Sequence, residues 1–186
     1  KRAGILCIWR AAADDGYCDP PRKVRAIKHA GRVIRAYGVD DMRRLLAAAR
    51  ALPGAFARTG INRAVWWESL LRCYWDTALR LSDLLRIERD WIERDGAIEL
   101  AQHKTGHLHR AQLSDATRAA IEAVLSQGPP RSLIWPLWAR REEMYKQYRA
   151  LRKAAGLPER SSSKWIRRGS ASAIEAQAPG TAWKHL

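Results

Sequence analysis

Cysteine, long apolar runs and acidic residues are all in short supply in this chain of 186 residues. Its three cysteines, Cys7, Cys18 and Cys73, are odd in number and have no paired spacing, which argues against a disulfide-stabilised fold and favours a reducing cytoplasm. No apolar run approaches the ~18 residues that a membrane span requires. The apolar stretch within residues 1–9 is too short for a signal peptide, and no cleavage site follows it. These absences favour a cytoplasmic protein that does not enter a membrane.

The shortage of acidic residues leaves a large positive charge. The chain has 34 Lys and Arg against 19 Asp and Glu, which gives a formal net charge of +15. A surplus of this size produces a field that gathers and steers polyanions, so nucleic acid is the expected partner. An anionic membrane surface is the weaker alternative, because the basic residues form no separate amphipathic segment.

Within the first forty residues, a predicted helix gives way to an extended basic segment at two prolines. Residues 4–13 are predicted to form a helix that ends before Gly16, since glycine commonly follows a helix end. Pro20 and Pro21 forbid a helix next, so an extended linker is expected there. The basic residues in and after it suit contact with a phosphate backbone, although a solvated basic loop fits the composition equally well. The candidates for this contact are Arg22, Lys23, Arg25 and Lys28.

A globular core is predicted from residue 40 onward. Apolar residues recur there at helical spacing, and Asp40 and Ser114 stand where helix N-caps are expected. The stretch 61–75 is apolar around most of its circumference, which indicates a buried helix. The expected helices cover residues 41–52, 61–75, 115–126, 138–155 and 164–177.

Strands are predicted around Asp95 and Gly96, because Asp-Gly between apolar segments is a strong signal of a hairpin turn. Residues 91–94 and 97–100 would form the two arms, and residues 108–113 would add a third strand after a second turn. The sequence therefore predicts a mainly α fold with a small three-stranded antiparallel β-sheet, an α+β domain.

Three basic residues occupy distinctive places in these elements. Arg80 interrupts an apolar run, where an unpaired charge would be costly, and this favours a functional role over that of an ordinary surface arginine. Lys104 lies in the second turn, and Arg167 lies on the last predicted helix. Arginine binds phosphate through two parallel hydrogen bonds and keeps its charge, so it can stabilise the negative charge that develops when a phosphodiester is broken.

The segments 77–85 and 164–168, with the turn of Lys104, Thr105 and Gly106 between them, resemble the catalytic domain of the tyrosine recombinases, or phage-type integrases. The resemblance implies an enzyme that breaks and rejoins DNA at specific sites through a 3′-phosphotyrosine, without a metal or other cofactor. It also implies double-stranded DNA as the partner and a homotetramer that works on two duplexes.

The resemblance further implies roles for individual residues. Arg80 and Arg167 would hold the scissile phosphate, and Asp83, three residues after Arg80, would pair with that arginine and orient it. Lys104 would donate a proton to the leaving 5′-oxygen, since neighbouring cations lower the pKa of a lysine.

Two further basic residues flank the second arginine. Lys164 stands where most relatives carry histidine, and it still supplies a cation and a hydrogen-bond donor to the phosphate. A lysine is a poorer base than histidine at neutral pH, so no acid–base role is expected for it. The adjacent Arg168 is assigned to a backbone contact with DNA or to a structural contact rather than to catalysis.

Three histidines near Lys104 could suggest a metal site. Their spacing is loose, and no cysteine or carboxylate cluster joins them, so a metal site is the disfavoured interpretation. A hairpin turn that faces DNA explains the polar residues at these positions. These residues are His103, His107 and His109.

The domain organisation follows from the same resemblance. Residues 1–16 would end a preceding helical DNA-binding domain, residues 17–39 would be a basic linker, and residues 40–186 would be the catalytic domain, incomplete at its C-terminus. The family continues with a Gly-His pair and then the nucleophilic tyrosine. We therefore expect no nucleophile in this chain, and no cleavage by this segment alone.

Two tyrosines could be proposed as substitutes for the nucleophile. Tyr145 and Tyr148 share a predicted helix stripe with Met144 and Leu151, so they are assigned to core packing instead. A catalytically inactive DNA-binding relative is consequently the main alternative to a recombinase. Lesser alternatives are a type IB topoisomerase, which uses the same phosphate clamp, and a helical nucleic-acid-binding domain with chance motifs.

Overall fold

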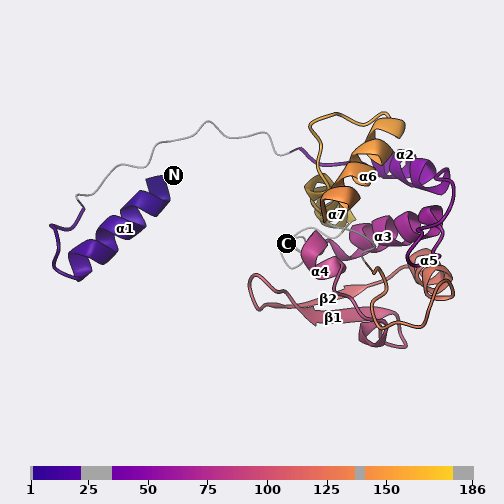
Figure 1. Cartoon of the computed structure of the whole chain (residues 1–186), viewed down its shortest axis with the longest axis horizontal. Helices are drawn as coiled ribbons and strands as arrows, with labels where there is room; N and C mark the ends of the chain where they lie inside the picture. Colours follow the sequence, from indigo (N-terminus) through magenta and orange to yellow (C-terminus); the bar gives the residue numbers. More distant parts are fainter. Residues whose placement is uncertain (1, 22–34, 137–140, 178–186) are drawn as a thin grey trace. The chain divides into compact units, whose positions relative to one another are not determined.

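The computed structural model describes residues 2–21, 35–136 and 141–177. The chain divides into two compact units, residues 1–34 and 35–186 (Figure 1). The basic candidates Arg22, Lys23, Arg25 and Lys28 lie outside the described residues, and the boundaries predicted for the linker and the catalytic domain stay predictions.

In the first unit, the described residues contain helix α1 (Arg2–Asp14), which confirms the helix predicted over 4–13. Gly16 follows it with a φ of 78°, a left-handed conformation that glycine adopts at little cost. This turn lets Tyr17 N donate to Ala12 O at 2.9 Å, which satisfies a carbonyl at the helix end.

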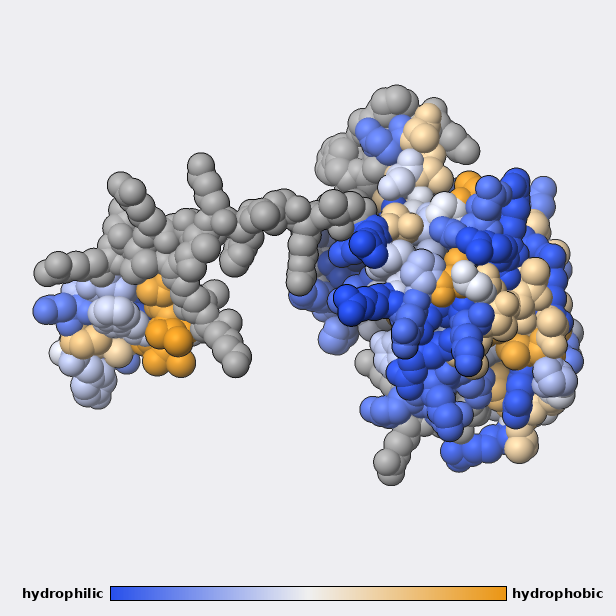
Figure 2. Space-filling model, turned by 90° about the horizontal axis from the view of Figure 1, so that it is seen from above, coloured by the Kyte–Doolittle hydropathy of each residue, from blue (hydrophilic) through white to orange (hydrophobic). Residues whose placement is uncertain are grey.

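The second unit is mostly helical with one short β-hairpin. In chain order its elements are α2 (Val39–Arg50), α3 (Arg63–Thr77), α4 (Leu81–Leu84), the 3-10 turn η1 (Arg89–Trp91), β1 (Ala97–Ala101), β2 (Leu108–Gln112), α5 (Asp115–Leu125), α6 (Arg141–Ala154) and α7 (Lys164–Gln177). Hydrophilic side chains cover most of the face of this unit seen in Figure 2. Among the described helices, none is both long and apolar enough to cross a membrane.

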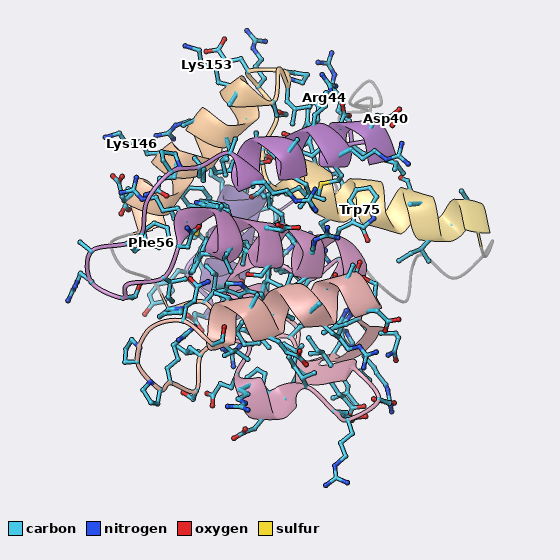
Figure 3. The ribbon with its side chains drawn as sticks, turned by 90° about the vertical axis from the view of Figure 1, so that its right-hand side faces the viewer. Asp40, Arg44, Phe56, Trp75, Lys146 and Lys153 are labelled. Carbon is cyan, nitrogen blue, oxygen red and sulfur yellow. The ribbon has the colours of Figure 1, made fainter. Side chains whose placement is uncertain are left out.

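Helix α3 forms the centre of this unit. Figure 3 shows α2 and α6 on one side of it, and α5 with the hairpin on the other, and α3 also contacts α4 and α7. Trp66, Trp67 and Leu70 are at most 2% exposed, so the buried helix predicted over 61–75 is confirmed. Each such side chain contributes about 1.5–3 kcal/mol when it leaves water, which explains why the other elements gather around α3.

The sheet has two strands among the described residues, not three as predicted. β1 and β2 pair antiparallel along their whole length. The segment 91–94 forms no strand, and only Ile92 makes an isolated bridge, to Ile98. The Asp-Gly turn is present, with Gly96 at a φ of 83° and Gly96 N donating to Glu93 O at 2.9 Å. The residues just before this tight turn form the 3-10 turn η1, so they cannot pair with β1 as a further strand.

Helix α2 begins two residues before the predicted position, and its N-cap is Gly38 rather than Asp40. The Asp41 carboxylate, inside the first turn, accepts from Gly38 N at 3.0 Å and so satisfies the open helix end. Asp40 instead forms an exposed ion pair with Arg43 at 2.7 Å.

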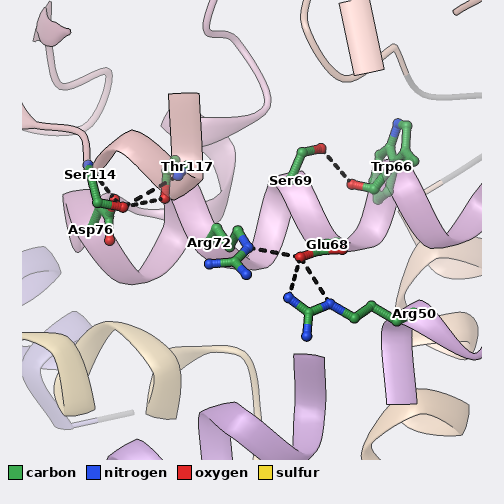
Figure 4. A network of polar contacts seen from close by, with 8 residues as sticks. All are labelled: Arg50, Trp66, Glu68, Ser69, Arg72, Asp76, Ser114 and Thr117. Atoms are coloured by element: carbon green, nitrogen blue, oxygen red, sulfur yellow. Dashed lines mark hydrogen bonds and ion pairs between the residues drawn. The ribbon is translucent and has the colours of Figure 1, made fainter. Parts of the chain in front are cut away.

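Ser114 caps α5 as predicted, because its hydroxyl accepts from Thr117 N at 3.3 Å (Figure 4). Ser114 also donates to the Asp76 carboxylate through its N–H at 2.9 Å and its hydroxyl at 2.8 Å, which ties α5 to the end of α3. Helix α7 has the predicted bounds, while α6 is described from residue 141 and its predicted start at 138 lies outside the described residues.

The C-terminal end of α3 holds the neighbouring elements through its backbone carbonyls. Thr77 O accepts from the ring of His109 on β2 at 2.8 Å, and Ala78 O accepts from Arg167 Nε on α7 at 2.7 Å. Trp75 O accepts from the Ser170 hydroxyl, also on α7. The last carbonyls of a helix lack partners within the helix, so these donors satisfy groups that burial would otherwise leave unpaired.

The His109 contact predicts a stability difference between two histidines of the hairpin. We expect His109→Leu to lower the free energy of unfolding by about 1–3 kcal/mol, because it leaves the buried Thr77 carbonyl without this donor. His107→Leu changes an exposed residue and should leave it within about 0.5 kcal/mol. Urea denaturation measures both, and equal effects would contradict the assigned role of His109.

A second polar network joins α2 to α3 (Figure 4). Glu68 Oε1 accepts from Arg50 Nη2 at 2.7 Å and from Arg72 Nε at 2.9 Å. The hydrogen bond from Arg50 is the main cause that lowers the pKa of Glu68, and burial opposes it. Because this pKa is lowered on folding, the stabilisation is present above the ordinary glutamate pKa and is lost as pH falls through the folded-state value.

We therefore expect Glu68→Gln to destabilise the protein by about 0.5–1 kcal/mol at neutral pH. The difference from the unsubstituted protein should shrink as pH falls below the ordinary glutamate pKa, since a protonated carboxyl resembles the amide. Thermal unfolding between pH 3 and 7 measures this, with the exposed Glu122→Gln on α5 as the control. A difference that is constant over this range would show that charge pairing is not the cause.

Candidate active site

Arg80 lies in the turn that joins α3 to α4. The buried Ala78 ends α3 with a φ of 49°, a left-handed conformation that is uncommon for residues other than glycine. This reversal leads to Arg80, whose extended backbone stands directly before α4. The half-buried side chain of Arg80 donates to Gln102 Oε1, at the start of the loop between β1 and β2.

Arg167, on α7, reaches the same turn. Its Nε donates to the Ala78 carbonyl, although the two residues are 89 positions apart in the chain. Burial lowers the pKa of Arg167, and the positive charge of Arg80 lowers it further. The Ala78 carbonyl that accepts from Arg167 lies two residues before Arg80, so both arginines belong to this one turn. The fold thus brings the two arginines of the sequence motifs together.

Asp83 is fully buried and holds the hairpin loop. Its Oδ1 accepts from His103 N at 3.1 Å, and Arg86 Nη1 lies 3.8 Å from the same oxygen. The predicted pairing with Arg80 is wrong: no ion pair or hydrogen bond joins these two described side chains, and the guanidinium donates to Gln102 instead. The charge of Asp83 nevertheless acts on Arg167, where it opposes the lowering of the pKa.

Lys104 is exposed in the loop between the two strands, within the predicted second turn. The loop is closed by its own backbone: Gln102 N donates to His107 O at 2.9 Å, and Gly106 N donates to Gln102 O at 2.8 Å. Gly106 has a φ of 67°, which the closure requires and which glycine tolerates. The contacts of Gln102 and His103 with Arg80 and Asp83 then fix the start of the loop against α4.

The two basic residues beside Arg167 differ in their contacts. Lys164 is the first residue of α7 and is exposed, about one helical turn before Arg167. Arg168 is exposed, and its Nη1 donates to Arg35 O at 3.4 Å. Arg168 therefore makes a structural contact with the protein backbone, which was one of the two roles expected for it. The other role, a contact with DNA, stays a prediction.

The tyrosines of this unit are mostly buried. Tyr37 and Tyr148 share a hydrogen bond of 3.2 Å between their hydroxyls, and burial raises the pKa of Tyr74, near Arg167, to about 12. The predicted packing stripe is confirmed for Tyr148 and is wrong for Tyr145, which is 42% exposed. Position 145 lies about 100° around the helix from the buried Met144, so it falls at the edge of the stripe.

The three histidines near Lys104 have unlike surroundings. His109 is buried against Thr77 O, whereas His103 and His107 are exposed. Across residues 2–21, 35–136 and 141–177, no group of three or more His, Cys, Asp or Glu side chains is arranged to hold a metal ion.

Gln102 is the residue of this site that the sequence analysis missed. It is 6% exposed and joins the Arg80 turn to the Lys104 loop. Its signal in the sequence is weak: an amide side chain just after a predicted strand and two residues before the motif lysine.

Comparison with known proteins finds a protein that is similar to this chain in sequence. No protein-family model matches the chain. The chain is 30% identical over 131 residues to the tyrosine recombinase XerD of Caulobacter vibrioides, a match that covers 69% of this chain and 41% of that protein. The aligned region is thus less than half of this relative's length.

Solved structures share the fold. XerA recombinase matches with a TM-score of 0.65 at 12% identity, over 83% of this chain and 56% of that one. A lambda integrase dimer bound to a COC′ core site matches with 0.71 at 20% identity, over 100% and 54%. A lambda integrase tetramer bound to a Holliday junction matches with 0.72 at 19% identity, over 100% and 56%. The chain therefore resembles the tyrosine recombinases and phage-type integrases, and its mainly helical fold, which here has a two-stranded antiparallel sheet, is similar to that of their catalytic domains.

Proposed function

We propose that this chain is the catalytic part of a site-specific recombinase or integrase that cleaves and rejoins double-stranded DNA through a 3′-phosphotyrosine. The meeting of Arg80 and Arg167 at the Ala78 turn carries the proposal. Two neighbouring guanidiniums repel each other, and a phosphodiester between them relieves the repulsion because its two non-bridging oxygens match their donors. The lambda integrase structures, which hold a core site and a Holliday junction, support DNA as the source of that phosphate.

In the proposed reaction, Arg80 and Arg167 bind the non-bridging oxygens of the scissile phosphate. A tyrosine hydroxyl gives up its proton to water, attacks phosphorus and forms the 3′-phosphotyrosine, while the bond to the 5′-oxygen breaks. Lys104 donates a proton to the leaving 5′-oxygen and takes it back when the 5′-hydroxyl of a partner strand attacks. Lys164 adds a cation to the phosphate from the first turn of α7.

The attacking tyrosine is not assigned to any of the five tyrosines in this sequence. Tyr37, Tyr74 and Tyr148 are buried, Tyr145 is exposed on α6, and Tyr17 belongs to the first unit. The alternative function stays that of a DNA-binding relative that does not cleave. The proposal includes assembly as a homotetramer on DNA, in line with the lambda integrase tetramer on its junction.

DNA binding by this chain tests the phosphate site directly. We expect Arg80→Ala and Arg167→Ala each to reduce the slope of log affinity against log salt by about one, because each removes one phosphate contact. Arg43→Ala on α2 is the control, since Asp40 already pairs with that charge. Fluorescence anisotropy with a duplex between 50 and 200 mM salt gives the slopes, and unchanged slopes for both variants would sink the proposed site.

The role of Lys104 is tested by cleavage in the complete gene product. Lys104→Ala should slow cleavage about 10²–10⁴-fold, the usual size of a general-acid contribution. A substrate with sulfur in place of the 5′-bridging oxygen should restore much of the rate, because a thiolate leaves without a proton. Lys146→Ala, exposed on α6, is the control. Cleavage by Lys104→Ala at the original rate would remove Lys104 from the mechanism, and no cleavage by the unsubstituted protein would favour the DNA-binding relative.

A further inference from the structure

Gln102 is the buried residue that links the two cationic elements of the site. Its Oε1 accepts from the Arg80 guanidinium and from the Thr105 hydroxyl, the latter at 3.2 Å. Its backbone N and O close the loop that carries Lys104, through hydrogen bonds with His107 O and Gly106 N. One residue therefore contacts Arg80 with its side chain and shapes the Lys104 loop with its main chain.

The residue after Gln102 adds a second attachment. His103 N donates to Asp83 Oδ1 at 3.1 Å, and Asp83 lies three residues after Arg80 on α4. Two consecutive loop residues are thus bonded to two residues of the Arg80 segment. This arrangement restricts how Lys104, the next residue, can move relative to Arg80.

We propose that Gln102 is a positioning residue that fixes the Arg80 guanidinium relative to the Lys104 loop, so that both cations face the same phosphate. This inference rests on the proposed function. A neutral amide suits the task better than a carboxylate, because it holds the guanidinium without cancelling its charge. Arginine has five N–H donors, so a contact with Gln102 leaves donors free for a phosphate.

DNA binding by this chain, with Gln102→Glu, is the first test. A carboxylate keeps an acceptor for Arg80 but neutralises its charge, so the salt slope should fall by about one, as for Arg80→Ala. Gln102→Met removes the acceptor but is neutral and of similar length, so the positive charge of Arg80 is not cancelled and the salt slope should stay unchanged. A Gln102→Glu slope equal to that of the unsubstituted chain would overturn the inference, since the guanidinium would then not be beside residue 102 in the complex.

Cleavage by the complete gene product is the second test. Gln102→Met should slow cleavage about 10- to 100-fold with little change in DNA affinity, because a displacement of about 1 Å in a catalytic group can cost up to about 10²-fold. In an Arg80→Ala background the same substitution should have no further effect, since it acts through Arg80. Gln147→Met on α6 is the matched control: it removes the acceptor of Trp67 Nε1, away from the site, and should keep the rate within about threefold.

The outcomes separate the inference from the function on which it rests. If Arg80→Ala leaves both the salt slope and cleavage unchanged, the proposed function fails. If Arg80→Ala loses cleavage while Gln102→Met keeps it, or if the two losses multiply in the double variant, only the role of Gln102 fails. Should Gln102→Met unfold, as a thermal melt would reveal, the Gln102→Glu slope still decides, because glutamate retains the acceptor.

Discussion

The C-terminal end of α3 is the physical constraint on which the rest of the site depends. A buried helix leaves its last carbonyls without partners, and burial makes unpaired carbonyls costly. Here Thr77 O accepts from His109 and Ala78 O accepts from Arg167, so the same requirement draws in the hairpin and α7. A positive side chain at this position also complements the negative end of the helix dipole. The arrangement of the site is therefore tied to the stability of the core.

The same helix end sets the charge of the site. The left-handed turn at Ala78 places Arg80 directly after α3, while the Ala78 carbonyl anchors Arg167 beside it. Like charges brought together in this way repel, and the cost is met by the core contacts and by the buried Asp83. In the function that we propose, this arrangement supplies electrostatic preorganisation, because the two cations are in place before the phosphate binds.

Local sequence signals predicted most elements well and failed where another part of the chain decided the outcome. Ser114 caps α5 as expected, because a cap is a contact between residues three apart. The strand predicted at 91–94 was wrong, since whether an extended segment joins a sheet depends on the path of the chain on both sides of it. Asp40 was wrong as a cap because Asp41 reaches the same helix end from inside the first turn.

The sequence by itself determined the candidates of the site: Arg80, Lys104 and Arg167 stand out by their residue type and by their order along the chain. It also determined the buried character of α3, since apolar residues around most of the circumference of a helix leave it little solvent-facing surface. Only the tertiary structure decided that Arg80 takes Gln102 rather than Asp83 as its acceptor. A hydrogen bond depends on distances of a few tenths of an ångström between side chains far apart in sequence, and residue spacing does not encode such distances.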